Sequence, residues 1–226
     1  MRVALALAGT VALLVALAIV LAGPDTYAEI ATADRFEEIP FRVPGNVAVE
    51  RRQSVRYDVA TRVALHSWTM RYVLGIDGGT PRDPTTRDPL FDAREQGHLA
   101  DVRSVFTGAR VAAVVGLILV VAILARARRR ARLIRDAALI ALGSVTVIGL
   151  IAAFAFEPAF LAFHLVFFPQ GNFLFDPETS ALLALYPDPY WYGVTLRIAG
   201  AFVMTMAAVA LIGHVSDRGS AIVTRR

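Results

Sequence analysis

Four long apolar stretches restrict what this chain can fold into. Residues 3–22 and 137–156 carry no charged side chain, and residues 106–125 and 193–213 carry only Arg110 and Arg197, respectively. A helix needs roughly 20 apolar residues to cross the hydrocarbon core of a membrane, and 56% of the chain is hydrophobic. The sequence therefore predicts an all-α membrane protein with four transmembrane helices, folded as a single membrane domain over residues 1–226.

The first stretch has to be distinguished from a cleaved signal peptide. A secretory signal has an apolar core of only about 7 to 15 residues before its cleavage site. Residues 3–22 form a longer apolar run, so we expect them to be retained as the first span.

A long polar segment, residues 23–105, separates the first two spans and is predicted to be a mostly helical insertion. Residues 41–50 contain β-branched side chains and a Pro-Gly-Asn turn, which allow a short β-ribbon. Residues 55–74 have apolar side chains at helical spacing, which predicts an amphipathic helix. These side chains are Val59, Val63, Leu65, Trp68 and Tyr72.

The segment between the last two spans, residues 157–192, is apolar and aromatic at its start. Its run 159–168 is too short to cross a bilayer. Pro158 tends to kink or end the preceding helix, and the sequence Pro-Gln-Gly-Asn at 169–172 is typical of a turn. We therefore expect a short segment lying at the membrane interface.

The arginines predict the orientation of the spans. Six arginines lie between Arg126 and Arg135, and the end of the chain carries Arg218, Arg225 and Arg226, whereas residues 157–192 contain neither arginine nor lysine. Short cytoplasmic loops carry an excess of positive residues. We therefore expect a multi-pass protein of the cell membrane with both termini cytoplasmic, and with residues 23–105 and 157–192 extracytoplasmic.

Two histidines are the candidate catalytic residues. His98 precedes the second span and His164 follows the third, so both are expected at the outer surface. Histidine acts as a general acid or base near neutral pH because its ordinary pKa is about 6.5. The residues expected to orient the histidines or to bind substrate are Arg94, Glu95, Asp101, Asp176 and Arg197.

The spacing of Glu95, His98 and Asp101 leaves several roles open. Residues three apart share roughly one helix face, which fits an orienting role or merely a solvated charged face. The pair Glu95 and His98 also has the spacing of two ligands of one metal ion. The partner motif that such a metal site needs is absent from the sequence, so we expect neither a metal ion nor another cofactor.

These residues carry a resemblance to a known family. The segment REQGHLADV before the second span, with FHLVFF, FDP and YPDPYW further on, resembles the lipoprotein intramolecular transacylase (Lit) family of bacterial four-span membrane proteins. Phe173 and Ser180 depart from the residues expected in that family. The resemblance implies that an ester-linked acyl chain of a diacylglyceryl lipoprotein moves to the α-amino group of its own cysteine, with His98 and His164 as the two family histidines.

The composition agrees with such a reaction. The chain has no cysteine, no lysine and no Gly-x-Ser-x-Gly motif, which excludes a cysteine nucleophile and the serine arrangement of α/β-hydrolases. A substrate amine held beside its ester needs only a base and positioning, and proximity can contribute roughly 7 to 11 kcal/mol. We therefore expect direct attack without a covalent enzyme intermediate.

Two other functions remain open on the sequence. The aromatic outer segment could bind a lipid or a protein partner without catalysis, and a metal-dependent membrane hydrolase could use His98, His164 and nearby carboxylates. The expected partners are diacylglyceryl-modified lipoproteins and membrane lipids. A nucleic-acid partner is not expected, because the arginines do not form a soluble basic domain with a binding motif.

Overall fold

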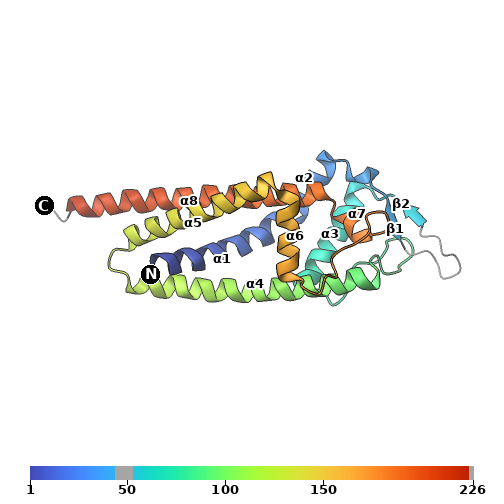
Figure 1. Cartoon of the computed structure of the whole chain (residues 1–226), viewed down its shortest axis with the longest axis horizontal. Helices are drawn as coiled ribbons and strands as arrows, with labels where there is room; N and C mark the ends of the chain where they lie inside the picture. Colours follow the sequence, from blue (N-terminus) through green and yellow to red (C-terminus); the bar gives the residue numbers. More distant parts are fainter. Residues whose placement is uncertain (44–52, 224–226) are drawn as a thin grey trace. The chain divides into compact units, whose positions relative to one another are not determined.

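The computed structural model describes residues 1–43 and 53–223, and these are almost entirely helical (Figure 1). The elements in chain order are α1 (Arg2–Leu21), α2 (Pro24–Ala33), the 3₁₀ helix η1 (Phe36–Glu38), β1 (Phe41–Val43), β2 (Gln53–Val55), α3 (Val59–Val73), α4 (Ala93–Arg126), α5 (Arg130–Phe154), α6 (Phe156–Phe167), α7 (Ala181–Leu185) and α8 (Asp188–Val223). Within this part of the chain, α1, α4, α5 and α8 are long and apolar enough to cross a membrane. The predicted all-α class with four spans is confirmed.

The chain divides into two compact units. Unit 1 consists of Met1–Leu21, Ala109–Ala159 and Thr195–Arg226, and it holds the apolar parts of the four long helices. Unit 2 consists of Ala22–Gly108 and Phe160–Val194, and it holds the polar insertion and most of the segment between the last two spans.

Unit 1 buries a small core and exposes much of its apolar surface. Its core includes Leu5, Ala137 and Phe202, whereas Ile118 and Val121 on α4 are more than half exposed. Apolar side chains on the outside of a helix are favourable when the surrounding solvent is hydrocarbon. The exposed faces of unit 1 are therefore those of a membrane bundle.

Small residues let the helices of unit 1 approach closely. Helix α1 packs along α5 (Figure 1), and Gly116 of α4 lies against the backbone of α1. A Cβ atom at Gly116 would stand 2.8 Å from the carbonyl oxygen of Ala8. Glycine is therefore required for this helix contact.

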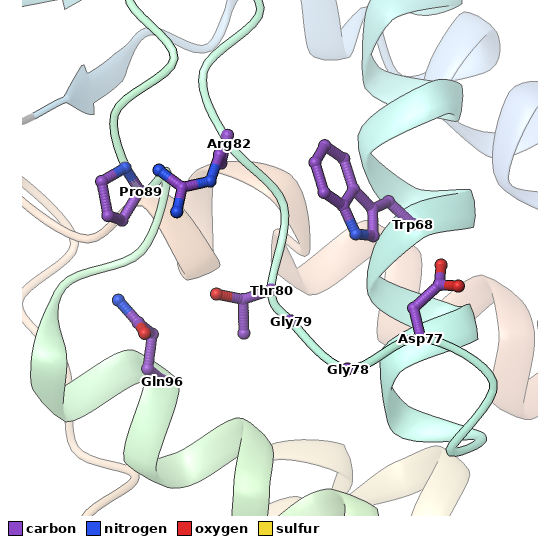
Figure 2. A pocket seen from close by; sticks show the side chains of 8 residues that line it. All are labelled: Trp68, Asp77, Gly78, Gly79, Thr80, Arg82, Pro89 and Gln96. Carbon is purple, nitrogen blue, oxygen red and sulfur yellow. The ribbon is translucent and has the colours of Figure 1, made fainter.

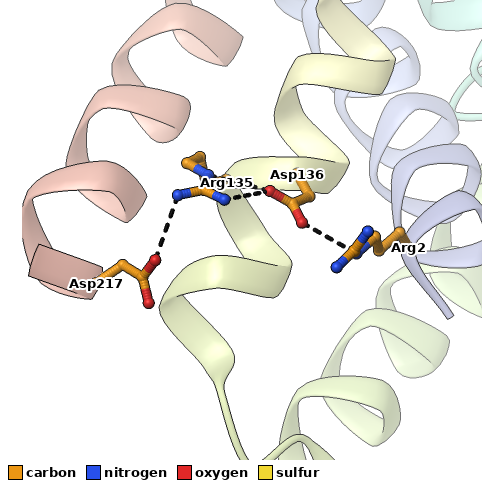
Figure 3. A network of polar contacts seen from close by, with 4 residues as sticks. All are labelled: Arg2, Arg135, Asp136 and Asp217. Atoms are coloured by element: carbon orange, nitrogen blue, oxygen red, sulfur yellow. Dashed lines mark hydrogen bonds and ion pairs between the residues drawn. The ribbon is translucent and has the colours of Figure 1, made fainter. Parts of the chain in front are cut away.

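A charged network joins three helices of unit 1 near one end (Figure 3). The Arg2 Nε atom lies 3.0 Å from an Asp136 oxygen, and the Arg135 guanidinium lies 2.8 Å from the other oxygen of Asp136 and 3.3 Å from Asp217. The network connects α1, α5 and α8 where their polar ends leave the apolar region.

Unit 2 is organised around a buried arginine on α3. The Arg62 side chain is fully buried, and it donates hydrogen bonds to the carbonyl oxygens of Tyr57, Ile39 and Ala184. The guanidinium also lies 4.7 Å from the ring centre of Phe41. One side chain thus ties α3 to the segment before it, to the residue after η1 and to α7.

Helix α3 confirms the helix expected in residues 55–74, but it buries a different face from the expected one. The buried residues are Arg62, Leu65, His66, Thr69 and Val73, so only Leu65 belongs to the predicted apolar stripe. The polar members are buried because each finds a hydrogen-bond partner in the interior of unit 2.

His66 is part of this interior. Its Nε2 atom lies 3.0 Å from the Ala22 carbonyl oxygen, its Nδ1 atom lies 3.1 Å from the Tyr186 hydroxyl, and its ring stacks on Tyr27 at 4.4 Å. Burial lowers the pKa of His66 to about 4. The histidine is therefore a neutral structural residue.

A short β-ribbon begins in residues 41–50, where it was predicted, but its second strand lies beyond that range at 53–55. Strand β1 pairs antiparallel with β2, with Phe41 opposite Val55. The predicted Pro-Gly-Asn turn, residues 44–46, lies outside the described residues, as do Arg225 and Arg226.

Candidate active site

His98 and His164 meet within unit 2. His98 lies on the first turns of α4 and His164 on the second half of α6. Their ring centres are 6.1 Å apart and the ring planes differ by 21°. No hydrogen bond joins the two rings in the described part of the chain, and the two predicted catalytic residues are therefore neighbours that contact each other through their ring faces.

Phenylalanine rings surround the pair. Phe168 lies 4.7 Å from His98 and 5.5 Å from His164, and it is itself almost fully buried. The other rings in contact with one of the two histidines are Phe160, Phe163, Phe173 and Phe175. These phenylalanines were not among the predicted site residues, although their density in residues 160–175 is visible in the sequence.

The hydrogen bond of His164 fixes its tautomer. The Nδ1 atom lies 2.8 Å from the carbonyl oxygen of Phe160 in the same helix. A carbonyl oxygen can only accept, so Nδ1 carries a hydrogen and donates it. In the neutral ring, the lone pair is then on Nε2, which is the position able to take a proton.

His98 is buried, with an exposed fraction of 6%. Burial lowers its pKa, and the neighbouring His164 lowers it further because two positive charges would repel each other. Asn172 opposes this shift, but the buried atoms His98 Nδ1 and Asn172 Oδ1 both lack a partner with hydrogen-bond geometry among the described residues. A ring nitrogen that can donate a hydrogen bond, His98 Nδ1, and an oxygen that can accept one, Asn172 Oδ1, are thus available to each other.

Asp101 acts on this arrangement through the turn that follows α6. One Asp101 oxygen accepts hydrogen bonds from the side-chain amides of Gln170, at 2.7 Å, and of Asn172, at 2.6 Å. The turn itself contains Gly171 with φ of 72°, a backbone conformation that favours glycine. Asp101 therefore holds the Asn172 amide nitrogen, and this leaves its oxygen for His98.

Glu95 is engaged elsewhere in unit 2. One of its oxygens accepts hydrogen bonds from Ser180 Oγ, at 2.5 Å, and from the Leu182 backbone N–H, at 2.9 Å. The other oxygen accepts from the Asp92 N–H, while Asp92 accepts from the Glu95 N–H, which is a capping box at the start of α4. The carboxylate joins α4 to α7 rather than contacting a histidine.

The remaining predicted site residues have separate positions. Arg94 donates to the Leu174 carbonyl oxygen at 3.3 Å and lies over the Phe175 ring, so it supports the aromatic segment. Asp176 is exposed and accepts from the Glu178 N–H and the Thr179 hydroxyl, which caps a local turn. Arg197 lies on α8 in unit 1, and its role stays a prediction.

A cavity of about 550 Å³ in unit 2 lies apart from the histidine pair, since neither histidine lines it. Figure 2 shows Trp68, Arg82 and Gln96 around this cavity. Among the described residues, no three His, Asp or Glu side chains converge as metal ligands. The histidine pair is therefore the candidate site, and the chemistry available there is proton transfer in an apolar shell.

Both the sequence and the fold resemble known proteins. Residues 80–191, which include both histidines, match the family described as lipoprotein intramolecular transacylase Lit. No curated protein matches the sequence. Among solved structures, the chain resembles the membrane integral lipoprotein intramolecular transacylase Lit from Bacillus cereus, with a TM-score of 0.74 and 12% identity over 99% of this chain and 95% of the other.

Two variants of the Bacillus cereus protein are also similar. The structure with a histidine replaced by arginine has a TM-score of 0.68 and 13% identity over 99% of this chain and 91% of the other. The structure with a histidine replaced by alanine has a TM-score of 0.66 and 12% identity over 95% and 93%. At these identities the structural similarity establishes the fold.

Proposed function

This chain belongs to the lipoprotein intramolecular transacylase family, and from that membership we propose that it acylates the N-terminal cysteine of diacylglyceryl-modified lipoproteins with one of their own acyl chains. The product is an N-acyl lyso-lipoprotein. The observation that carries the proposal is the pairing of His98 with His164, at 6.1 Å between ring centres, inside an aromatic shell. Such a pair can orient an amine and move its proton.

We propose that the reaction needs no covalent enzyme intermediate. The α-amino nitrogen of the substrate attacks the ester carbonyl carbon, an amide C–N bond forms, and the ester C–O bond breaks. The amine loses one proton, and the leaving glycerol oxygen gains one. Because amine and ester belong to one molecule, the enzyme has to orient them and move one proton, and orientation alone can contribute roughly 7 to 11 kcal/mol.

The two histidines are assigned different tasks. The Phe160 carbonyl oxygen holds the hydrogen of His164 on Nδ1, so His164 Nε2 is proposed to take the amine proton and return it to the leaving oxygen. The lowered pKa of His98 favours its neutral form. With its Nδ1 hydrogen directed at Asn172 Oδ1, His98 has its lone pair on Nε2, which is proposed to accept a hydrogen bond from the substrate amine and so orient it. Asp101 and Asn172 are proposed to position His98, and no metal ion or cofactor is assigned.

The surface of α6 fits a lipid-bearing substrate. None of the residues of α6 is buried, and Leu165 and Val166 are 57% and 71% exposed. Exposed apolar side chains on a helix are favourable in contact with lipid acyl chains and unfavourable in contact with water. Substrate acyl chains in the membrane could therefore reach His164, which lies next to these residues in the sequence.

The proposed orientation places both termini in the cytoplasm and the histidine pair outside. It rests on the six arginines between Arg126 and Arg135. Single cysteines replacing the exposed residues Thr85 and Glu178 should react with a membrane-impermeant thiol reagent in intact cells, and one replacing the exposed Ser216 should not. Labelling of Ser216→Cys alone would reverse the orientation.

The proposed reaction is tested with the variants His98→Ala and His164→Ala. General acid–base groups contribute typically 10² to 10⁴-fold, and residues that act as a unit are strongly non-additive. Each variant should lower acyl transfer by that factor, and the double variant should be little worse. The measurement is mass spectrometry of lipoprotein N-termini from cells that make each variant.

The control is His214→Ala, because His214 lies on α8 in unit 1. His66 is not a suitable control, since it is fully buried and stacked on Tyr27. All variants must be present in the membrane at similar amounts. Near-normal transfer by His164→Ala at a normal protein level would contradict the proposed mechanism and favour lipid binding without catalysis.

A further inference from the structure

A second cavity, of about 870 Å³, lies in unit 1 where α4 turns into α5. Five arginines line it, namely Arg2, Arg126, Arg128, Arg129 and Arg132. Ligand pockets in proteins are typically about 300 to 1,000 Å³, so this cavity accommodates a phosphate-bearing headgroup rather than only a single small ion.

The cavity concentrates positive charge. No carboxylate is among the side chains that line it in the described part of the chain. Arg2 pairs with Asp136 outside the lining, and Arg132 also interacts electrostatically with Asp136, whereas Arg128 and Arg129 form no ion pair among the described residues. Like charges this close together repel each other, and an anion bound between them would remove that repulsion.

The backbone at the start of α5 also favours an anion in this cavity. Helix α5 begins beside the cavity at Arg130, and its N-cap residue Arg129 makes no side-chain capping hydrogen bond. The first turn of α5 contains no acidic residue. The first N–H groups of the helix thus add partial positive charge to that of the arginines.

The cavity is also partly apolar. Val3 of α1 and Leu133 of α5 line it together with the arginines, and α1, α4 and α5 are all candidate membrane spans. The charged side chains are therefore next to the point where apolar helices leave the membrane. A ligand that has a phosphate at one end and hydrocarbon at the other matches both parts of the lining.

We propose that this cavity binds the phosphate-bearing headgroup of an anionic membrane phospholipid, which holds the ends of α1, α4 and α5 together. This role goes beyond the orienting effect of the same arginines. Orientation needs only positive charge on a short loop, whereas the cavity uses the forked guanidinium geometry that pairs with phosphate.

The test compares two double variants of the full chain, each of which removes two arginines. R128Q/R132Q alters the cavity, and R130Q/R218Q serves as the matched control, because Arg130 and Arg218 are exposed and do not line the cavity. Each purified variant is titrated with phosphatidylglycerol in phosphatidylcholine nanodiscs, and the bound phosphatidylglycerol is counted by native mass spectrometry.

The cavity variant should bind phosphatidylglycerol about 30-fold more weakly, since each arginine near an anionic lipid contributes about fivefold. The control variant should stay close to the unaltered protein. R128K/R132K keeps the charge for correct insertion and should still bind more weakly than the unaltered protein, since lysine lacks the guanidinium fork.

Two results would overturn the proposal. Equal weakening in R128Q/R132Q and R130Q/R218Q would mean that general surface charge attracts the lipid. Displacement of the lipid by inorganic phosphate at the same concentration would mean that the cavity is a soluble-phosphate site. Cysteine labelling at Glu178 in every variant verifies that the orientation is unchanged.

Discussion

Replacing Glu95 with glutamine tests whether this buried carboxylate supports the fold or acts in catalysis. The side chain is 2% exposed, and its two oxygens accept hydrogen bonds from Ser180 Oγ, the Leu182 N–H and the Asp92 N–H. In Glu95→Gln, the NH₂ group must face at least one of these donors. The least costly rotamer points the NH₂ group at the Asp92 N–H and keeps the other two bonds as neutral ones.

The loss of unfolding free energy in Glu95→Gln can be worked out from these hydrogen bonds. A hydrogen bond to a charged group contributes about 1.5 to 3 kcal/mol, against about 1 kcal/mol for a neutral one. Losing one such bond and weakening two gives a destabilisation of roughly 3 kcal/mol. For a chain of this size, that corresponds to a fall in melting temperature of roughly 6 to 12 °C.

The assay is thermal unfolding of the purified protein in detergent, followed by the fluorescence of Trp68 and Trp191, both of which lie in unit 2. Ser180→Ala removes one donor to Glu95, so its effect should overlap with that of Glu95→Gln in a double-mutant cycle. Acyl transfer per folded molecule should persist at low temperature in Glu95→Gln. An unchanged melting temperature with lost transfer would refute the structural role and would make Glu95 an active-site group.

His66 has a pKa of about 4 in the folded protein against an ordinary value of about 6.5, so on acidification the unfolded chain binds a proton there before the folded chain does. Roughly 3 kcal/mol of unfolding free energy should therefore be lost as the pH falls from about 6.5 to about 4. A melting temperature that is constant over this range would contradict the assignment. Gly116→Leu should lower the melting temperature, because its Cβ would meet the Ala8 carbonyl oxygen at 2.8 Å, while Gly200→Leu, with no atom near its Cβ, should not. Asn172→Leu should reduce acyl transfer and shift its pH profile with little change in melting temperature, and an unshifted profile would remove Asn172 from the positioning of His98.

The spans could be predicted from the sequence, because membrane helices follow from a local property. Twenty uncharged residues at 3–22 or 137–156 have few other stable conformations in a chain of this composition. The short segment around His164 was also predictable, since Pro158 and the turn at 169–172 bound it on both sides, and α6 and Gly171 occur there. Both inferences needed only neighbours in the sequence.

The buried face of α3 could not be predicted in this way. Arg62 and His66 would count as solvent-facing residues in any periodicity argument, yet they are fully buried. Their partners, such as the carbonyl oxygens of Ala184 and Ala22, are distant in the sequence. A polar residue is buried in a core only when the fold supplies partners for its hydrogen bonds. Which distant carbonyl oxygens become those partners cannot be read from the residues around Arg62 and His66.

The environment of His98 shows how helix geometry separates residues that the sequence groups together. Each residue turns an α-helix by about 100°, so positions three apart differ by about 60° and positions six apart by about 120°. Glu95 and Asp101 therefore flank His98 on α4, and each faces a different segment: Glu95 reaches α7, and Asp101 reaches the turn at 170–172. In the proposed mechanism, the two carboxylates hold the segments around His98, and the histidines carry out the proton transfer. For the proposed intramolecular acyl transfer this division is sufficient, because the substrate supplies both the nucleophile and the ester.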